Sequence, residues 1–98
     1  MNLSSSQRKY LRGLAHPLKP VVVVGHEGVT DSVMAEVGQA LDDHELIKIR
    51  FGDFKEEKVA LCEQMIKHSG AALAGMIGHV AIFYRPKRDL SRRKIQLP

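Results

Sequence analysis

Apolar residues recur along this chain at two different spacings, and these spacings predict where helices and strands lie. Spacings of three and four residues, typical of one helical face, predict helices at residues 4–15, 31–43 and 54–69. Continuous apolar runs or strict alternation predict strands at residues 21–24, 46–51, 72–77 and 79–84. The predicted order of elements is therefore α-β-α-β-α-β-β.

The character of each strand predicts how the strands assemble into a sheet. The valine run at residues 21–24 is typical of a buried strand in parallel pairing. In the strand at residues 46–51, alternation turns Lys48 and Arg50 away from the core. Gly78 lies between the last two predicted strands, which predicts that they form a β-hairpin. Two right-handed crossovers followed by a hairpin predict a two-layer α/β fold with a four-stranded mixed sheet.

The length and composition indicate one folded unit. The chain has 98 residues, the size of a single domain, and no internal repeat. Its 44% hydrophobic and 27% charged residues are ordinary for a globular protein. We expect residues 1–88 to form this domain. Residues 89–98 are basic and lack periodicity, so we expect them to form a flexible C-terminal tail.

Several features predict the cellular compartment. No apolar run approaches the roughly 18 residues needed to span a bilayer, and the first ten residues show no secretory signal. Cys62 is the only cysteine, which excludes an intrachain disulfide and suits a reducing environment. We therefore expect a cytoplasmic monomer with no membrane partner.

The net charge of +4 is distributed unevenly along the chain. Residues 1–20 carry a net charge of +4 and residues 85–98 carry +5, whereas residues 21–84 carry −5. This segregation favours an anionic partner that is contacted by both ends of the chain. The alternative is that both basic ends are merely solvated and have no partner.

The four residues Gly25, His26, Glu27 and Gly28 form a Gly-x-x-Gly motif between a predicted strand and a predicted helix. Glycines let a backbone approach a ligand closely, and the first N–H groups of a helix favour phosphate-type anions. The motif lacks the lysine of a Walker loop and the third glycine of a dinucleotide site. Glu27 weakens the case for tight phosphate binding by this loop alone, and an ordinary turn is the alternative.

Residues that could support catalysis do not form a recognisable set. The five histidines are not spaced as metal ligands, and Cys62 lies on an apolar helical face, as a structural thiol would. The acids, among them Glu45, are expected at helix ends or on exposed faces. We therefore predict no catalytic residue, no metal and no cofactor. Tyr84 and Arg85 could stack on an unpaired base, or could simply end a core strand.

Several motifs together resemble a known family, the CRM (chloroplast RNA splicing and ribosome maturation) domain. The resemblance spans roughly residues 3–88, nearly the whole chain. The segments that carry it are the opening Leu11 to Pro20, the loop Gly25 to Thr30, the segment His44 to Lys48, the pair Ile77-Gly78, and the end Phe83 to Pro86. The chain is similar to the stand-alone, YhbY-like bacterial form of this domain.

This resemblance implies an RNA-binding domain whose fold is similar to the C-terminal domain of bacterial translation initiation factor three. For the bacterial form it implies association with precursors of the large ribosomal subunit, and hence with ribosomal RNA. The family's Gly-x-x-Gly loop is compared with that of KH domains and maps onto residues 25–28. The basic surface would draw on the cations Arg8, Arg12, Lys19, Lys48, Arg50, Arg85, Lys87 and Arg88.

These observations predict a mechanism based on charge and shape. Arg8 and Arg12 are four residues apart on one helix, so both can reach one phosphate path. Only five aromatic residues occur, which favours recognition of structured RNA through its backbone over base-by-base reading. One alternative is a ribosome-assembly module with mainly protein contacts and a nonspecific basic tail. A second is a small phosphotransfer or nucleotide-binding enzyme, which rests on the Gly-x-x-Gly motif alone.

Overall fold

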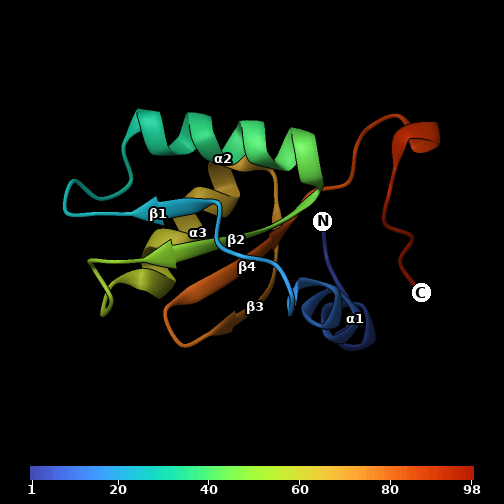
Figure 1. The fold of residues 1–98 in the computed structure, drawn as a ribbon, viewed down its shortest axis with the longest axis horizontal. Helices are drawn as coiled ribbons and strands as arrows, with labels where there is room; N and C mark the ends of the chain where they lie inside the picture. The colour runs from blue at the N-terminus through green and yellow to red at the C-terminus, as the bar shows by residue number, and fades with distance from the viewer.

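The computed structural model describes residues 1–98 and contains three α-helices, four strands and one short 3-10 helix (Figure 1). In chain order the elements are α1 (Ser5–Ala15), β1 (Val22–Val24), α2 (Asp31–His44), β2 (Leu46–Phe51), α3 (Lys58–Ser69), β3 (Ala72–Ile77), β4 (Val80–Tyr84) and η1 (Leu90–Arg92). The predicted order of helices and strands is confirmed.

The four strands form one mixed sheet in the order β1-β2-β4-β3. β1 runs parallel to β2, with Val23 opposite Arg50, and β4 runs antiparallel to both β2 and β3. β3 and β4 form the predicted hairpin, and Gly78 adopts a positive φ of 59° in its turn. The prediction of an α/β fold with a four-stranded mixed sheet is confirmed.

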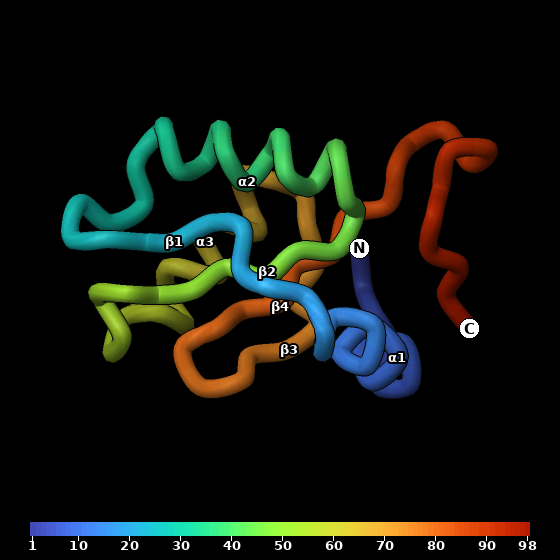
Figure 2. The backbone as a smooth tube through the Cα atoms, in the orientation of Figure 1, coloured from blue at the N-terminus to red at the C-terminus, as the bar shows by residue number.

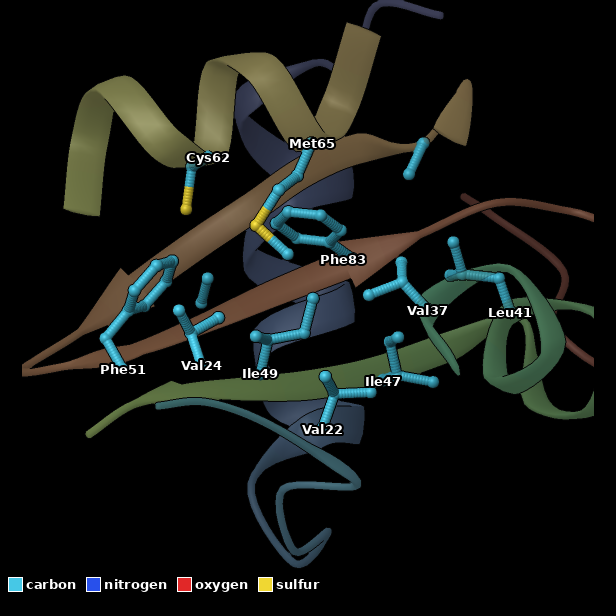
Figure 3. Close-up of a cluster of buried hydrophobic side chains, with 12 residues drawn as sticks. Val22, Val24, Val37, Leu41, Ile47, Ile49, Phe51, Cys62, Met65 and Phe83 are labelled. Carbon is cyan, nitrogen blue, oxygen red and sulfur yellow. The ribbon is translucent and has the colours of Figure 1, made fainter. Parts of the chain in front are cut away.

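Helices α2 and α3 cover one face of the sheet, and the main core lies between them and the strands (Figure 3). Alternate residues of β2 point into this core, as the sequence predicts. Figure 3 shows Cys62 and Met65 of α3 pointing toward the strands. Burying each large side chain here stabilises the fold by about 1.5–3 kcal/mol. The main core consists of Val22, Val24, Val37, Leu41, Ile47, Ile49, Phe51, Cys62, Met65, Ala71, Ala81 and Phe83.

Helix α1 packs on the opposite face of the sheet, against β3, β2 and β4. A smaller second core lies beneath it, formed by Leu11, Ala15, Leu46, Ala74, Ile82 and Tyr84. The buried stripe of α1 is narrow, so this helix covers only part of the face. Val23 and Ile77 remain 45% and 59% exposed on the uncovered part. The two-layer prediction therefore describes the sheet with α2 and α3, and α1 adds partial cover on the other side.

Two predicted segments differ from the structure in detail. Helix α3 begins at Lys58 instead of residue 54, because Phe54 has a φ of 56° and interrupts any helix there. Val59, predicted on the apolar face, is 58% exposed. The valine run is buried on one face only, because α1 does not cover the other face of β1 and Val23 is turned to solvent there. β1 is also an edge strand of the sheet. Apolar spacing alone does not distinguish an edge strand from a central one.

The ends of the helices follow the sequence signals. Ser4 caps α1 in a capping box with Gln7, and the Thr30 hydroxyl accepts the N–H of Val33 at 3.1 Å. Gly70 ends α3 in the left-handed conformation, with a φ of 72°. None of the three helices is long and apolar enough to cross a membrane.

The chain after β4 packs back onto the domain. Ile95 and Leu97 contact the second core, and the Gln7 amide donates to the Pro98 carbonyl at 3.3 Å. The predicted tail at residues 89–98 was expected to lack such contacts. We call residues 86–97 the C-terminal arm.

Candidate nucleic-acid interface

The Gly-x-x-Gly loop is a tight turn at the end of β1, as its sequence predicts. The Gly28 N–H donates to the Gly25 carbonyl at 3.0 Å, and Gly28 has a φ of 75°. A Cβ at Gly28 would lie 3.5 Å from the Phe54 ring, whereas a Cβ at Gly25 would meet open space. His26 and Glu27 are exposed at the tip. The contact with Phe54 would be an ordinary one, so it is the positive φ that favours glycine at position 28. Gly25 leaves a stretch of backbone that a ligand can approach.

A second loop runs beside the Gly-x-x-Gly loop. The Val24 carbonyl accepts the N–H groups of Gly52 and Asp53 at 3.0 and 3.2 Å, which fixes the turn after β2 next to the end of β1. Asp53 is exposed, so it and Glu27 place two carboxylates at this end of the sheet. Attraction of a polyanion must therefore come from cations elsewhere on the surface.

The two arginines of α1 are partly committed to contacts within the domain. Arg12 donates to the Ala74 carbonyl at 3.2 Å, and its stem lies so close to Gly75 that a Cβ there would be 2.6 Å from Arg12 Cδ. Arg8 donates to the Leu3 carbonyl at 2.7 Å. Each guanidinium has five N–H donors, so both retain donors for a phosphate. Lys9 is not among the predicted contacts, but its side chain is exposed and forms no hydrogen bond within the chain.

The cations of the connector and of β2 differ in availability. Lys48 donates to the carbonyls of His16 and Leu18 at 3.2 and 3.0 Å. It so holds the connector between α1 and β1, residues 16–20, against β2. The side chains of Lys19 and Arg50 are exposed and form no hydrogen bond within the chain. Of the predicted phosphate contacts in this region, the structure therefore leaves Lys19 and Arg50 free and gives Lys48 a structural role.

Arg85 joins three parts of the domain. It donates to the carbonyls of Ser69 and Gly38 at 2.6 and 3.1 Å and pairs with the Asp42 carboxylate at 2.7 Å. Tyr84 is 2% exposed, and burial together with nearby Glu45 raises its pKa. The suggestion that Tyr84 and Arg85 stack on a base is therefore wrong for Tyr84, whose ring packs in the second core.

Glu45 was expected at an exposed helix end, but it is fully buried. Its carboxylate accepts the backbone N–H groups of Lys87, Lys94 and Ile95 at 2.9, 2.7 and 3.2 Å. Burial by itself would raise the pKa of Glu45, but these three N–H donors outweigh it and lower the pKa below its ordinary value. Glu45 is the single residue between α2 and β2, and it has a positive φ of 64°, which is uncommon for a residue other than glycine.

Two predicted contacts lie in the C-terminal arm. Arg88 is exposed and Lys87 is half-buried.

Cys62 belongs to the main core. Burial raises the pKa of its thiol to about 11, which leaves almost no thiolate near neutral pH. The prediction of a buried structural thiol is confirmed. No group of three or more histidine, cysteine or acidic side chains gathers as a metal site would require.

The exposed cations spread along the molecule instead of converging on one pocket. The domain measures 38 × 23 × 23 Å, with the Gly-x-x-Gly loop at one end of the long axis and the C-terminus at the other (Figure 2). α1 carries three bases and no acid, whereas α2 on the opposite face carries four acids and no lysine or arginine. α3, which packs beside α2, carries two lysines and one acid, so the contrast holds between α1 and α2. The elongated distribution of cations suits an extended polyanion better than a small ligand.

Comparison with known proteins assigns this architecture to a family. The sequence model of the CRS1 / YhbY (CRM) domain matches residues 3–85. A Haemophilus influenzae protein named RNA-binding protein is 42% identical over 98% of this chain and 95% of its own length. A Bacillus subtilis protein named as a candidate RNA-binding protein is 32% identical over 98% of this chain and 99% of its own length.

A solved structure has the same fold. The solution structure of a Staphylococcus aureus protein, described as a candidate RNA-binding protein, aligns with a TM-score of 0.83. The alignment covers 99% of this chain and 100% of that one, at 28% sequence identity. The resemblance stated from the sequence motifs is therefore confirmed at the level of family and fold.

Proposed function

We propose that this chain, which belongs to the CRS1 / YhbY (CRM) domain family, binds ribosomal RNA in precursors of the large ribosomal subunit and assists their assembly. It acts in the cytoplasm as a binding protein and catalyses no reaction. The observation that carries the proposal is the opposite charge of the two helices on the two faces of the sheet. The names of its relatives in Haemophilus influenzae and Bacillus subtilis support RNA as the partner.

In this proposal, freely exposed cations contact phosphates and the remaining cations hold the surface in shape. Lys9, Lys19 and Arg50 lie on the α1 side of the sheet with no partner in the chain, so they meet the RNA backbone. Arg12 and Lys48 fix α1 and the connector against the sheet. These contacts keep the surface rigid before RNA binds, which lowers the entropic cost of binding.

The Gly-x-x-Gly loop positions the RNA at the far end of this surface. Gly25 has no side chain, so a phosphate can approach the backbone of this loop closely. A loop that acts like the Gly-x-x-Gly loop of KH domains would need such an approach. The acids Glu27 and Asp53 limit its attraction for phosphate, so the loop sets register and the α1 side supplies affinity.

Recognition by shape fits the side chains that are exposed. Phe51, Phe83 and Tyr84 are buried, which leaves Tyr10 and Phe54, at 41% and 40% exposure, as the accessible aromatics. Two scattered rings do not form a platform for stacking successive bases. Structured RNA, read through its backbone and groove shape, is therefore the target we propose.

A protein partner is the second candidate, and the exposed apolar side chains Val23 and Ile77 favour it. They flank Arg50 and Val80 in one row across the uncovered part of the sheet. A ribosomal protein that packed on this row would bury it. In that case removing apolar side chains would weaken binding to particles but leave binding to bare RNA unchanged.

The proposal is tested by binding purified large-subunit ribosomal RNA at several salt concentrations. The variant Lys19→Gln/Arg50→Gln removes two free cations, and Ser32→Glu/Ala35→Glu makes the same change in net charge on exposed positions of α2. We expect the first variant to bind more weakly, with a salt slope lower by about two, and the second to bind like the original chain. Equal weakening by both variants would argue against an RNA surface on the α1 side.

The identity of the RNA is tested in cells. Cross-linking the chain to RNA and sequencing the attached fragments should recover large-subunit ribosomal RNA, concentrated in particles lighter than the mature subunit. Recovery of unrelated RNAs without such enrichment would contradict the assembly role.

A further inference from the structure

The C-terminal arm closes into a defined loop around one buried carboxylate. Glu45 is the one charged side chain that is fully buried, at 0% exposure. One of its oxygens accepts the N–H of Lys87 and the other accepts the N–H groups of Lys94 and Ile95. Residues seven and eight positions apart in the chain are thereby held at the same point. Figure 1 shows the arm leaving the sheet beside the end of α2 and turning back toward α1.

Other contacts brace the same loop. The Arg93 guanidinium donates to the Lys87 carbonyl at 2.7 Å, across the loop. The Asp89 carboxylate accepts the N–H and hydroxyl of Ser91 at 3.0 and 2.7 Å and caps η1. The Glu45 carbonyl also accepts the Arg85 N–H at 2.8 Å, which fixes where the arm begins. The arm is therefore ordered from its start by residues of the domain.

The outer side of the arm presents free cations. Arg88 and Arg92 are exposed, and together with Lys87 they line a cavity of about 780 Å³ next to the end of α3. The two acids on its wall already have partners, since Asp42 pairs with Arg85 and Asp89 binds Ser91. Only two of the eleven lining residues are hydrophobic, so the cavity suits a charged ligand better than an apolar one. These cations have the chemistry to contact phosphate oxygens.

We propose that Glu45 is a positioning residue that folds the arm into a second RNA-contacting surface, in which Lys87, Arg88 and Arg92 meet phosphates at the end of the molecule opposite the Gly-x-x-Gly loop. This inference rests on the proposed function, because it assumes that the partner is RNA. A free basic tail would lose conformational entropy whenever it bound, whereas an arm that is already ordered avoids that cost. The arm and the Gly-x-x-Gly loop then contact one RNA at points separated along the 38 Å length of the domain.

The charge of Glu45 makes the inference sharply testable. Glu45→Gln keeps the size of the side chain but turns an NH₂ group toward the N–H donors, so at least one hydrogen bond to the arm is lost. It also removes a negative charge, which by electrostatics alone would strengthen RNA binding. Asp43→Asn is the matched control, because it makes the same charge change on the neighbouring exposed acid.

The experiment combines amide hydrogen exchange with binding to purified large-subunit ribosomal RNA, using the full chain. We expect the Lys87, Lys94 and Ile95 amides to be protected in the original chain and to exchange freely in Glu45→Gln, while β2 and β4 stay protected. RNA affinity should fall by about three- to tenfold in Glu45→Gln, and Asp43→Asn should bind at least as tightly as the original chain. Tighter binding by Glu45→Gln, or unprotected arm amides in the original chain, would overturn the inference.

A second variant keeps the test valid if Glu45→Gln disturbs the sheet. Arg88→Gln/Arg92→Gln leaves the carboxylate and its three N–H bonds intact and removes only the outward cations. We expect weaker RNA binding with the arm amides still protected, and unchanged binding would overturn the RNA role of the arm. If the original chain itself bound no ribosomal RNA, the proposed function would fail, whereas unchanged binding in the arm variants alone would refute only this inference.

Discussion

Helices α1 and α2 pack on opposite faces of one sheet, yet their exposed surfaces have opposite charge. α1 carries Arg8, Lys9 and Arg12 and no acid, and it covers only part of its face. α2 carries four acids and no lysine or arginine, and with α3 it covers the main core. Both helices bury an apolar stripe, so packing does not require this difference. Under the proposed function, the α1 face is the one that meets a polyanion.

The two faces also differ in how their polar groups are used. On the α1 side, Arg12 and Lys48 donate to backbone carbonyls of distant segments. The side chains of Lys9, Lys19 and Arg50 on this side form no hydrogen bond within the chain. On the α2 side, the Asp42 carboxylate pairs with Arg85, and most other acids are solvated. One face is thus built to present cations at fixed positions, and the other is built to cover the core.

The largest expected effect comes from inverting the charge of the α1 side. The triple variant Lys9→Glu, Lys19→Glu, Arg50→Glu should lower affinity for large-subunit ribosomal RNA by at least about 100-fold at low salt and reduce the salt slope by about three. These side chains make no contact that the fold needs, so the unfolding temperature should change little. Filter binding across a salt series measures the slope. A salt slope that remained unchanged in the triple variant would remove the distinction between the two faces.

A smaller effect separates the two glycines of the loop next to the α1-side surface. Gly28→Ala should destabilise the domain by about 1–2 kcal/mol, because a side chain is strained at its φ of 75°. Gly25→Ala meets open space, so its stability should stay within about 0.5 kcal/mol of the original chain while RNA binding weakens. Urea unfolding and RNA titration of both variants provide the measurement. Full RNA affinity in Gly25→Ala would exclude a close approach of RNA to the loop backbone.

The pH dependence of stability tests the link between the end of α2 and the arm. The folded pKa of Glu45 is lowered, so its stabilising contribution is present above its unfolded value of about 4.5 and is lost as pH falls through the folded pKa. Lys87 and Tyr84 are the ionisable groups that interact with Glu45 through their charge. Urea midpoints of the original chain should therefore decline more steeply below pH 4.5 than those of Glu45→Gln. Parallel declines in the two proteins would contradict this assignment.

The smallest expected effect concerns the reactivity of Cys62, in the main core under α2 and α3. With its pKa raised to about 11 by burial, the Cys62 thiol should resist alkylation at neutral pH in the folded chain and react fully once the chain is unfolded. Iodoacetamide labelling followed by mass spectrometry measures this. Rapid labelling of the native protein would mean that the main core under α2 and α3 opens far more easily than its packing indicates.

The local sequence determines the elements well because their signals are local. Alternation in β2 and the turn at Gly78 act within a few residues, and both lie where they were predicted. The caps at Ser4 and Thr30 are equally local signals. The start of α3 was predicted four residues too early. The apolar spacing of a helix extends to Phe54, but the positive φ of Phe54 is not helical, so the helix begins only at Lys58.

The roles of individual charged residues were harder to predict because their partners are distant in the chain. The carbonyl that Arg12 contacts lies 62 residues away, and the Lys94 N–H that Glu45 accepts lies 49 residues away. Periodicity carries no information on such pairs. The sequence therefore predicted a basic surface from its composition, and that surface stays a prediction. It did not separate the free cations Lys19 and Arg50 from Lys48, whose side chain holds the connector.

Mapping the RNA contact by NMR tests the central claim most directly. A ¹⁵N-labelled chain would be titrated with the ribosomal RNA fragment recovered by cross-linking. The account predicts the largest amide shift changes in α1, the connector at residues 16–20, the loop at residues 25–28, Arg50 and the C-terminal arm. Residues 31–40 of α2 should be nearly unchanged, because only the end of α2 lies beside the arm. Changes concentrated on α2, with the α1 side unaffected, would contradict it.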